Sequence, residues 1–266
     1  RLFGVKLIFV PTGCHEQETK AVWMTYDNGN VCNNCGQFDR CNDDLNNLRF
    51  SRIRRYFNTT IQADLDSSQF NTSVIKYKSI DLKLWNPKIN IPNEHLLPPT
   101  KNLRILHAHY LVNSKRNWQD RNIKGSPFVL KAIERLKAEG HKVEYFFIDD
   151  KPSNQMRFYQ SQADIIVDEL IYGSWGSTSV ETMALGKPVV CYLSSRFKEL
   201  FFRQFPEYSE LPFIEANTSN IYDVLKSLVM DKSFRTQKGY ESRRFAEAHY
   251  DPVKNTQDFI NLLESL

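Results

Sequence analysis

The chain has 266 residues, of which 41% are hydrophobic, and Lys plus Arg exceed Asp plus Glu by 35 to 31, a formal charge of +4. This length suits one large α/β unit or two modest ones with a sizeable core. The charge is far below what neutralising a nucleic-acid backbone requires, so we expect no nucleic-acid partner and, for any anionic partner, a small one. No apolar run approaches the roughly 20 residues that span a bilayer, and no leader precedes the first strand, which predicts a soluble, cytoplasmic protein.

The first 85 residues show the pattern of half an α/β domain. The apolar run "VKLIFV" at 5–10 predicts a buried strand, and it follows Arg1 so closely that we expect the chain to start inside a domain. A basic helix is expected near 44–57, a short strand at 58–62 and a further helix that opens near Asp64.

Four of the five cysteines lie in the first 41 residues, with the spacing C-x17-C-x2-C-x5-C. Thiolates this close together suit a tetrahedral structural zinc better than they suit disulfides in a reducing cytosol. One C-x2-C pair and two single cysteines match a zinc site imperfectly, which favours the alternative of thiols in an Asn/Asp-rich excursion. The expected zinc ligands are Cys14, Cys32, Cys35 and Cys41.

The stretch "NPKINIPNEHLLPPTKN" at 86–102 contains four prolines and neither a helical nor an alternating pattern. Such a composition is typical of a linker or a surface connection. We therefore place a domain boundary here, with a partial N-terminal α/β domain at 1–88 and a second domain at 89–266.

After this linker, apolar strand patterns alternate regularly with helical patterns. The alternation predicts parallel βαβ units and an α/β fold with a doubly wound sheet, whose ligands bind beyond the carboxyl ends of the strands. Ser126 is expected to cap the first helix, with Pro127 at its first position. We expect strands at 103–110, 143–148, 164–167 and 188–193, and helices at 126–138, 154–161, 178–185, 219–230, 234–249 and 252–265.

Two loops at these carboxyl ends contain residues that suit a phosphate. "NSKRNWQDRNIKGS" includes Arg121 and Lys124, a guanidinium that can bind two phosphate oxygens and an ammonium that acts as a point charge. "YGSWGSTSVETMALGKPVV" at 172–190 combines a glycine-containing turn with the start of a helix, where free N–H groups form a small anion site. The ordinary alternative for the two cations is a solvated loop.

Glu181 and two histidines have structural explanations as well as functional ones. Thr178-x-x-Glu181 has the spacing of a capping box, in which Glu181 holds the start of a helix and binds no ligand, and the spacing alone favours this alternative. His107 and His109 share one face of their strand near its carboxyl end. We expect His107 to be a satisfied core residue and His109 to be a candidate ligand.

The basic helix contains the run "NLRFSRIRRYF", with four arginines among apolar residues. Such a helix can attract anionic headgroups, so peripheral contact with the inner membrane surface is one expectation. A solvated helix face is the more common outcome.

"ADIIVDELIYGSWGSTSVETMALGKPVVCY" resembles the donor-site segment of GT-B glycosyltransferases of the large retaining class, which includes bacterial sugar transferases for lipopolysaccharide and capsule. "HAHYLVNSKRNWQDRNIKGSPFVLKAIERLKAEG" resembles the basic loop and following helix of the same family. The resemblance covers 100–266 in order and spacing. It covers the first 85 residues more weakly, as the second half of the family's acceptor domain, and it implies a Rossmann-like C-terminal domain.

The resemblance implies a transferase that moves a sugar from a UDP- or GDP-sugar to a glycan or a lipid-linked acceptor, with no metal cofactor in catalysis. By position, Glu181 binds the ribose hydroxyls, while Arg121 and Lys124 stabilise the charge on the departing diphosphate. The remaining expected binding residues are Gly176, Ser177 and Thr178 for the diphosphate, and His109 and Asp168 from their places at strand ends.

The sequence departs from the family pattern at one position. The family has two glutamates eight positions apart, and Gly173 stands where the first is expected. Asp168 or Glu169, at the exit of the preceding strand, are candidates to supply the missing carboxylate. The departure keeps two alternatives open, namely a nucleotide-sugar-binding module without transfer activity and a nucleotide-sugar epimerase of the same architecture.

Overall fold

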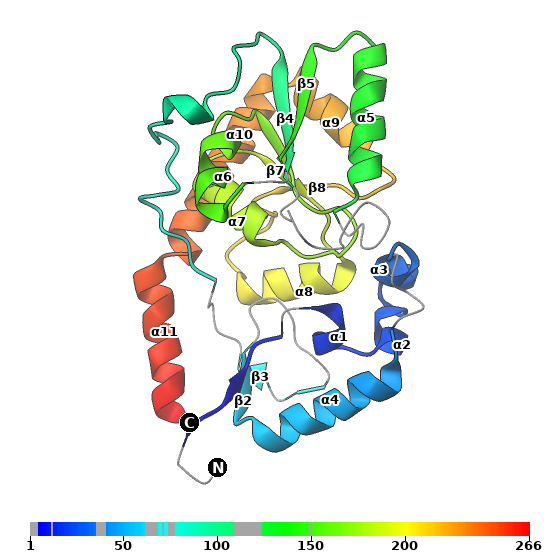
Figure 1. Cartoon of the computed structure of the whole chain (residues 1–266), viewed down its shortest axis with the longest axis vertical. Coiled ribbons are helices and arrows are strands. Elements are labelled where there is room, and N and C mark those ends of the chain that lie inside the picture. Colours follow the sequence, from blue (N-terminus) through cyan, green and yellow to red (C-terminus); the bar gives the residue numbers. More distant parts are fainter. Residues whose placement is uncertain are drawn as a thin grey trace.

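The computed structural model describes residues 5–11, 13–35, 41–61, 69–70, 72–73, 78–108, 124–148 and 151–266. Two parallel sheets organise the described chain, one with three strands and one with five. The five-stranded sheet lies in the upper half of the elongated molecule and the three-stranded sheet in the lower half (Figure 1). The expectations for Asp64, His109 and Arg121 lie outside the described residues.

The smaller sheet has the order β1-β2-β3 and is formed by Ile8–Phe9, Thr59–Ile61 and Thr72–Ser73. In its described residues, the excursion after β1 contains the short helices α1 (Cys14–Gln17), α2 (Lys20–Trp23), η1 (Tyr26–Gly29) and α3 (Asn30–Asn33).

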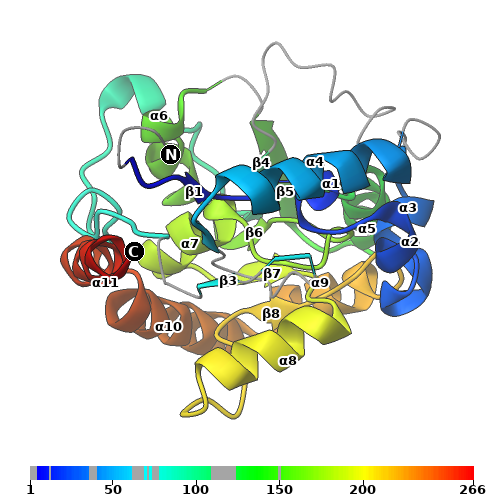
Figure 2. The same ribbon diagram turned by 90° about the horizontal axis from the view of Figure 1, so that it is seen from below.

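Helix α4 (Asp43–Tyr56) confirms the expected basic helix, displaced by one residue. Its first turn is fixed by the Asn42 side chain, which accepts hydrogen bonds from the N–H groups of Asp44 and Leu45. Phe50 and Ile53 are buried on its inner face. Seen from below, α4 crosses the near end of the molecule (Figure 2).

The larger sheet confirms the expected doubly wound α/β fold, with the order β5-β4-β6-β7-β8 and parallel pairing throughout. Its strands are β4 (Leu103–Ala108), β5 (Val143–Ile148), β6 (Ile165–Val167), β7 (Val189–Cys191) and β8 (Ile214–Glu215). Its helices are α5 (Ser126–Ala138), α6 (Ser153–Gln160), α7 (Ser177–Ala184), α8 (Ser195–Gln204), α9 (Ile221–Met230), α10 (Lys232–His249) and α11 (Pro252–Ser265), and the connection before β4 contains the short η3 (Asn93–His95).

Side chains of successive strand residues leave opposite faces of this sheet, so two cores form. On one face, Val167 and Val190 pack with the buried side of α5 and α9. On the other, Val189 and Cys191 pack with α7, α8 and α10. The apolar character of both faces explains why these strands are continuous hydrophobic runs.

Helix α11 leaves the larger sheet and runs down beside the smaller one (Figure 1). Its N-terminus is capped by the Asp251 carboxylate, which accepts from the N–H groups of Val253 and Lys254. At its far end, the Lys6 ammonium donates to the Leu266 carbonyl. Within the described part of the chain, no helix combines the length and apolar character needed to cross a membrane.

Candidate functional site

The strand order places the topological switch point of the larger sheet between β4 and β6. The chain passes from β4 through α5 to β5 on one side, and returns through α6 to β6 on the other side of β4. The connections at the carboxyl ends of β4 and β6 therefore diverge, which is where doubly wound sheets bind ligands. Lys124, which comes just before α5, and the turn that begins at Asp168 flank this point.

Asp168 links the two sides of this switch point, because it contacts both Lys124 and Ser179. Its Oδ1 forms an ion pair with the Lys124 ammonium, and its Oδ2 accepts from the backbone N–H of Ser179 at 3.1 Å and from the Ser179 hydroxyl at 2.6 Å. Asp168 is fully buried, and Glu169 Oε2 lies 3.8 Å from the same ammonium. A carboxylate thus occupies the positive end of α7 and holds Lys124 beside it.

The charges in this cluster stabilise one another. Burial alone would lower the pKa of Lys124, but the carboxylates of Asp168 and Glu169 outweigh burial and raise that pKa above its usual value. Burial would likewise raise the pKa of Asp168, but Lys124 and the Ser179 donors hold it below its usual range. Both groups are therefore charged at neutral pH.

Glu181 belongs to the same cluster and does not form the capping box. The N-cap of α7 is Gly176, and Glu181 Oε2 accepts from Gln160 Nε2 at 3.1 Å. The box is absent because α7 begins at Ser177, one residue before Thr178, so Thr178 lies inside the first turn and is not its N-cap. Burial raises the pKa of the half-buried Glu181 to about 7, against the lowering effect of Gln160.

A pocket of about 580 Å³ opens beside Glu181 and the start of α7. Lys78 reaches into this region from the segment after the smaller sheet, and its ammonium donates to the Trp175 carbonyl at 3.1 Å. The lining residues are Lys78, Ser79, Ile80, Asp81, Leu84, Trp85, Ser153, Asn154, Arg157, Ser177, Val180 and Glu181. The pocket therefore combines two cations, two carboxylates and an apolar wall.

The turn before α7 is built without a side chain at Gly173. Its φ is +85°, in the left-handed region, and a Cβ there would lie 2.8 Å from Ser194 Cβ and 3.0 Å from the Ser194 backbone nitrogen. Trp175 packs inside the turn, 2% exposed, and donates its Nε1–H to the Tyr250 hydroxyl at 2.6 Å. A glutamate at position 173 has no room in this backbone conformation.

His107 is the satisfied core histidine that its strand position predicted. It is fully buried, with Nδ1 2.9 Å from the Val167 carbonyl oxygen and Nε2 2.7 Å from the Ser126 hydroxyl. The expected cap at Ser126 is wrong, because Gly125 is the N-cap of α5 and the Ser126 hydroxyl is engaged with His107.

The cysteines do not assemble the expected zinc site. Across the described ranges, no three His, Cys, Asp or Glu side chains are arranged to hold a metal ion. Burial and the neighbouring thiols of Cys14, Cys41 and Cys35 raise the pKa of Cys32 to about 11. Without a metal ion, Cys32 is therefore a protonated thiol at neutral pH.

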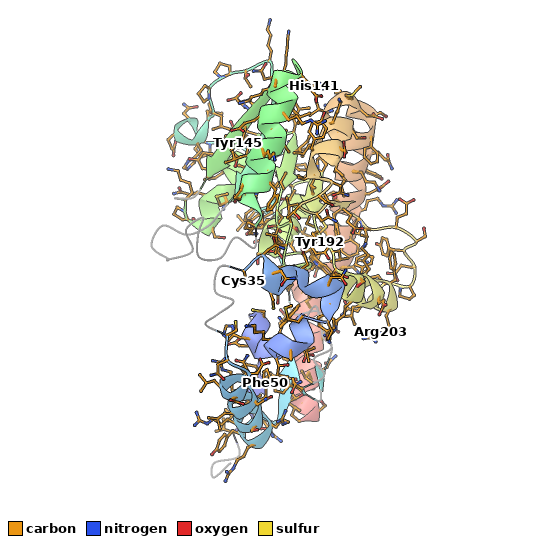
Figure 3. The ribbon with its side chains drawn as sticks, turned by 90° about the vertical axis from the view of Figure 1, so that its right-hand side faces the viewer. Cys35, Phe50, His141, Tyr145, Tyr192 and Arg203 are labelled. Carbon is orange, nitrogen blue, oxygen red and sulfur yellow. The ribbon has the colours of Figure 1, made fainter. Side chains whose placement is uncertain are left out.

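Polar contacts join the short N-terminal helices to the larger sheet. The Asp27 carboxylate accepts from the hydroxyls of Tyr192 and Ser195, and Arg196 lies 3.5 Å from Glu18, which is fully buried. Tyr192 and the labelled Cys35 lie at the level where these helices meet the second sheet (Figure 3). These contacts thus hold the N-terminal helices against the segment that joins β7 to α8.

The structure brings together several of the predicted site residues, namely Lys124, Asp168, Gly176, Ser177, Thr178 and Glu181, around the start of α7. In the structure, Gln160, Lys78 and Ser179 also contact this site, and none of the three was predicted as a site residue. Ser179 could have been found as a hydroxyl in the first turn, whereas Gln160 and Lys78 meet the site through contacts that no local pattern indicates.

No known protein-family profile and no curated protein matches this sequence. Solved structures do match it. Sucrose-phosphate synthase from Thermosynechococcus elongatus is similar over 99% of this chain and 69% of that chain, with 12% identity and a TM-score of 0.63. HepE from Anabaena, in complex with UDP and glucose, is similar over 98% of this chain and 72% of that chain, with 13% identity and a TM-score of 0.64.

TarM from S. aureus, in complex with fondaparinux, alpha-GlcNAc-glycerol and UDP, is similar over 84% of this chain and 47% of that chain, with 13% identity and a TM-score of 0.52. At these identities the likeness concerns the fold. Together with the two parallel sheets and the switch point between β4 and β6, it identifies the architecture: the chain has the fold of the GT-B glycosyltransferases.

Proposed function

We propose that this protein transfers a sugar from a nucleoside-diphosphate sugar to a glycan or lipid-linked acceptor, with retention as in the class that its motif resembles. The observation that carries the proposal is the link from Lys124 through Asp168 to the first turn of α7, because it places a cation beside a helix N-terminus at the switch point of the sheet. The GT-B fold and neighbours crystallised with UDP support the same conclusion.

Lys124, Glu181 and the first turn of α7 then each have a role in binding the donor. The Ser179 N–H is taken by Asp168, so the diphosphate binds the N–H groups of Ser177 and Thr178 and the ammonium of Lys124. Glu181 faces the pocket, where its carboxylate accepts hydrogen bonds from the ribose hydroxyls of UDP or GDP. From the sequence alone, we also assign Arg121 and His109 to the donor site.

Asp168 acts through its neighbours in this scheme. Its Oδ1 already accepts from Lys124 and its Oδ2 from Ser179, and the residue is fully buried. It therefore positions the cation and the helix start, and it does not replace the carboxylate missing at Gly173.

The chemistry follows from where charge develops. When the glycosidic bond breaks, positive charge grows on the sugar and negative charge on the departing diphosphate. Preorganised donors around that diphosphate act in the transition state, and the loss of one typically raises the barrier by about 2.7 to 4 kcal/mol. Cations supply this stabilisation here, so the proposal requires no metal ion in catalysis.

One observation favours a second candidate, a nucleotide-sugar-binding module without transfer activity. The family's first glutamate contacts the donor sugar, and the backbone at Gly173 leaves no room for it. Such a module would bind the donor and release no nucleotide.

Calorimetry with UDP-glucose and GDP-mannose, followed by nucleotide release with and without an acceptor glycan, tests both candidates. A transferase binds one donor and releases nucleotide faster when an acceptor is present. Binding without release favours the module, and conversion of the donor itself indicates an epimerase. Failure to bind any nucleotide or nucleotide-sugar contradicts the proposal.

The outer face of α4 supports peripheral membrane contact for a lipid-linked acceptor. Leu45, Leu48 and Tyr56 are 62%, 48% and 52% exposed, and Arg52 and Arg55 are exposed beside them. This combination suits anionic headgroups. In sedimentation with phosphatidylglycerol vesicles, the wild type should be found in the pellet with the vesicles and the Arg52→Glu/Arg55→Glu variant in the supernatant. Equal sedimentation of both proteins would contradict the contact.

A further inference from the structure

Gln160 is a buried amide whose only hydrogen-bonding counterpart identified among the described residues is the Glu181 carboxylate. It is the last residue of α6 and is fully buried. Its Nε2 donates to Glu181 Oε2 at 3.1 Å, and its Oε1 has no hydrogen-bond partner in the described part of the chain. Burying an amide with an unsatisfied carbonyl oxygen lowers stability.

Folding alone does not explain this residue. A leucine or methionine at position 160 would fill a similar volume without burying a polar group, so it would serve the core at least as well. What only the amide provides is a donor directed at one oxygen of Glu181. The contact joins the end of α6 to the middle of α7, the two helices that line the pocket.

We propose that Gln160 is a positioning residue that fixes the orientation and the charged state of Glu181 for ligand binding. With Oε2 engaged by Gln160, the carboxylate is held so that it can accept ligand hydroxyls in the pocket. The identity of those hydroxyls, the ribose of a nucleoside-diphosphate sugar, rests on the proposed function. The coupling between Gln160 and Glu181 does not.

Several other groups act on the charge of Glu181. Burial has the largest effect and raises its pKa to about 7, and the Asp168 carboxylate also raises it, whereas Gln160, Lys124 and Ser153 lower it. The further charged groups that line the pocket with Glu181 are Lys78, Asp81 and Arg157. Removing the Gln160 donor leaves these groups in place, so the pKa of Glu181 should rise further.

The test uses Gln160→Leu and Gln160→Met, with Gln155→Leu on the same helix as the control. Calorimetry with UDP-glucose between pH 6 and 9 follows the affinity. In the wild type and the control, affinity should increase as the pH rises through about 7, because the ionised carboxylate is the better acceptor. In both Gln160 variants the midpoint should move up by about one pH unit or more, the usual effect of a hydrogen bond to a charged group.

A Glu181→Gln background separates positioning from packing. There Gln160→Leu should change neither the pH profile nor the affinity, since no carboxylate remains to be ionised. An equal loss of affinity in both backgrounds, or an unmoved midpoint in folded Gln160 variants, overturns the proposal.

A readout without ligand keeps the two hypotheses distinguishable. Carbon-13 NMR of the Glu181 side-chain carboxyl should show a titration near pH 7 in the wild type and a higher midpoint in Gln160→Leu. If this shift occurs but UDP-glucose and GDP-mannose do not bind, the proposed function fails and the coupling stands. If a donor binds but the carboxyl midpoints are equal, the coupling fails and the proposed function stands.

Discussion

Replacing Glu181 by glutamine should stabilise the protein at alkaline pH while it weakens donor binding. Glu181 is half-buried beside Asp168, and burial raises its pKa from 4.5 to about 7. The folded protein therefore holds this proton more tightly than the unfolded chain does. The contribution of the protonated Glu181 to the free energy of unfolding is therefore complete below about pH 4.5, and it is lost as the pH rises through 7.

The magnitude follows from the separation of the two pKa values. At 1.36 kcal/mol for each pH unit, an ionised Glu181 lowers the free energy of unfolding by about 3 kcal/mol at pH 8. Residual solvent contact makes this an upper value. Glutamine carries no charge, and its carbonyl oxygen can still accept from Gln160 Nε2, so Glu181→Gln should be more stable than the wild type by up to about 3 kcal/mol at pH 8. At pH 5 the difference should shrink to about 1 kcal/mol or less.

Urea unfolding at pH 5 and pH 8 measures this difference, and calorimetry with UDP-glucose at pH 8 measures the expected loss of binding. Glu199→Gln, on an exposed position of α8, provides a control in which neither quantity should change. The reasoning is refuted if Glu181→Gln is less stable than the wild type at pH 8, or if its stability relative to the wild type does not depend on pH.

Three further changes test other parts of the structure. Lys124→Ala should lower sugar transfer at least a hundredfold. It should also lower the free energy of unfolding by about 3 kcal/mol or more, because the buried Asp168 loses its cationic partner and keeps only the Ser179 donors; unchanged turnover in the folded variant would remove Lys124 from the mechanism. Gly173→Ala should cost about 2 kcal/mol more in urea unfolding than Gly140→Ala, which has nearly the same φ, +84°, but no atom within 4 Å of the added Cβ, and equal costs would show that the turn relaxes. Mass spectrometry should find Cys32 alkylated by iodoacetamide at pH 8 about a hundredfold more slowly than glutathione, whereas equal rates would contradict its raised pKa.

Much of the larger sheet could be predicted from local sequence. Helices α5 and α11 have the expected bounds, and α6 and α7 begin one residue before the expected positions. These segments follow one another along the chain, and each has a clear period and a boundary residue. Helix α8 was not expected, although Ser194 caps it and Phe197 and Phe201 recur at helical spacing, so the signal was present.

The candidate site was predictable in its residue types but not in its connections. Lys124 and Glu181 were expected near the start of α7, and that is where they lie. The capping box was a wrong expectation because α7 starts before Thr178, and the Glu181 carboxylate accepts from Gln160 Nε2 on α6. Another carboxylate, Asp168 at the end of β6, takes the Ser179 N–H of the first turn from 11 positions earlier in the chain. Contacts of this kind depend on how strands pair, which spacing within one helix does not report.

Gly173 shows how one backbone choice changes what the site can do. The left-handed turn there lets the Gly173 carbonyl accept from the Ser194 N–H at 2.9 Å, and Ser194 in turn caps α8, which ties the turn before α7 to the start of the next helix. A glutamate introduced at 173 would have to break this arrangement. We therefore expect that a single substitution to the family's first glutamate disturbs the turn and does not place a carboxylate against a sugar. Under the proposed function, a carboxylate that contacts the donor sugar would therefore come from another position, because the buried Asp168 is already bonded to Lys124 and Ser179.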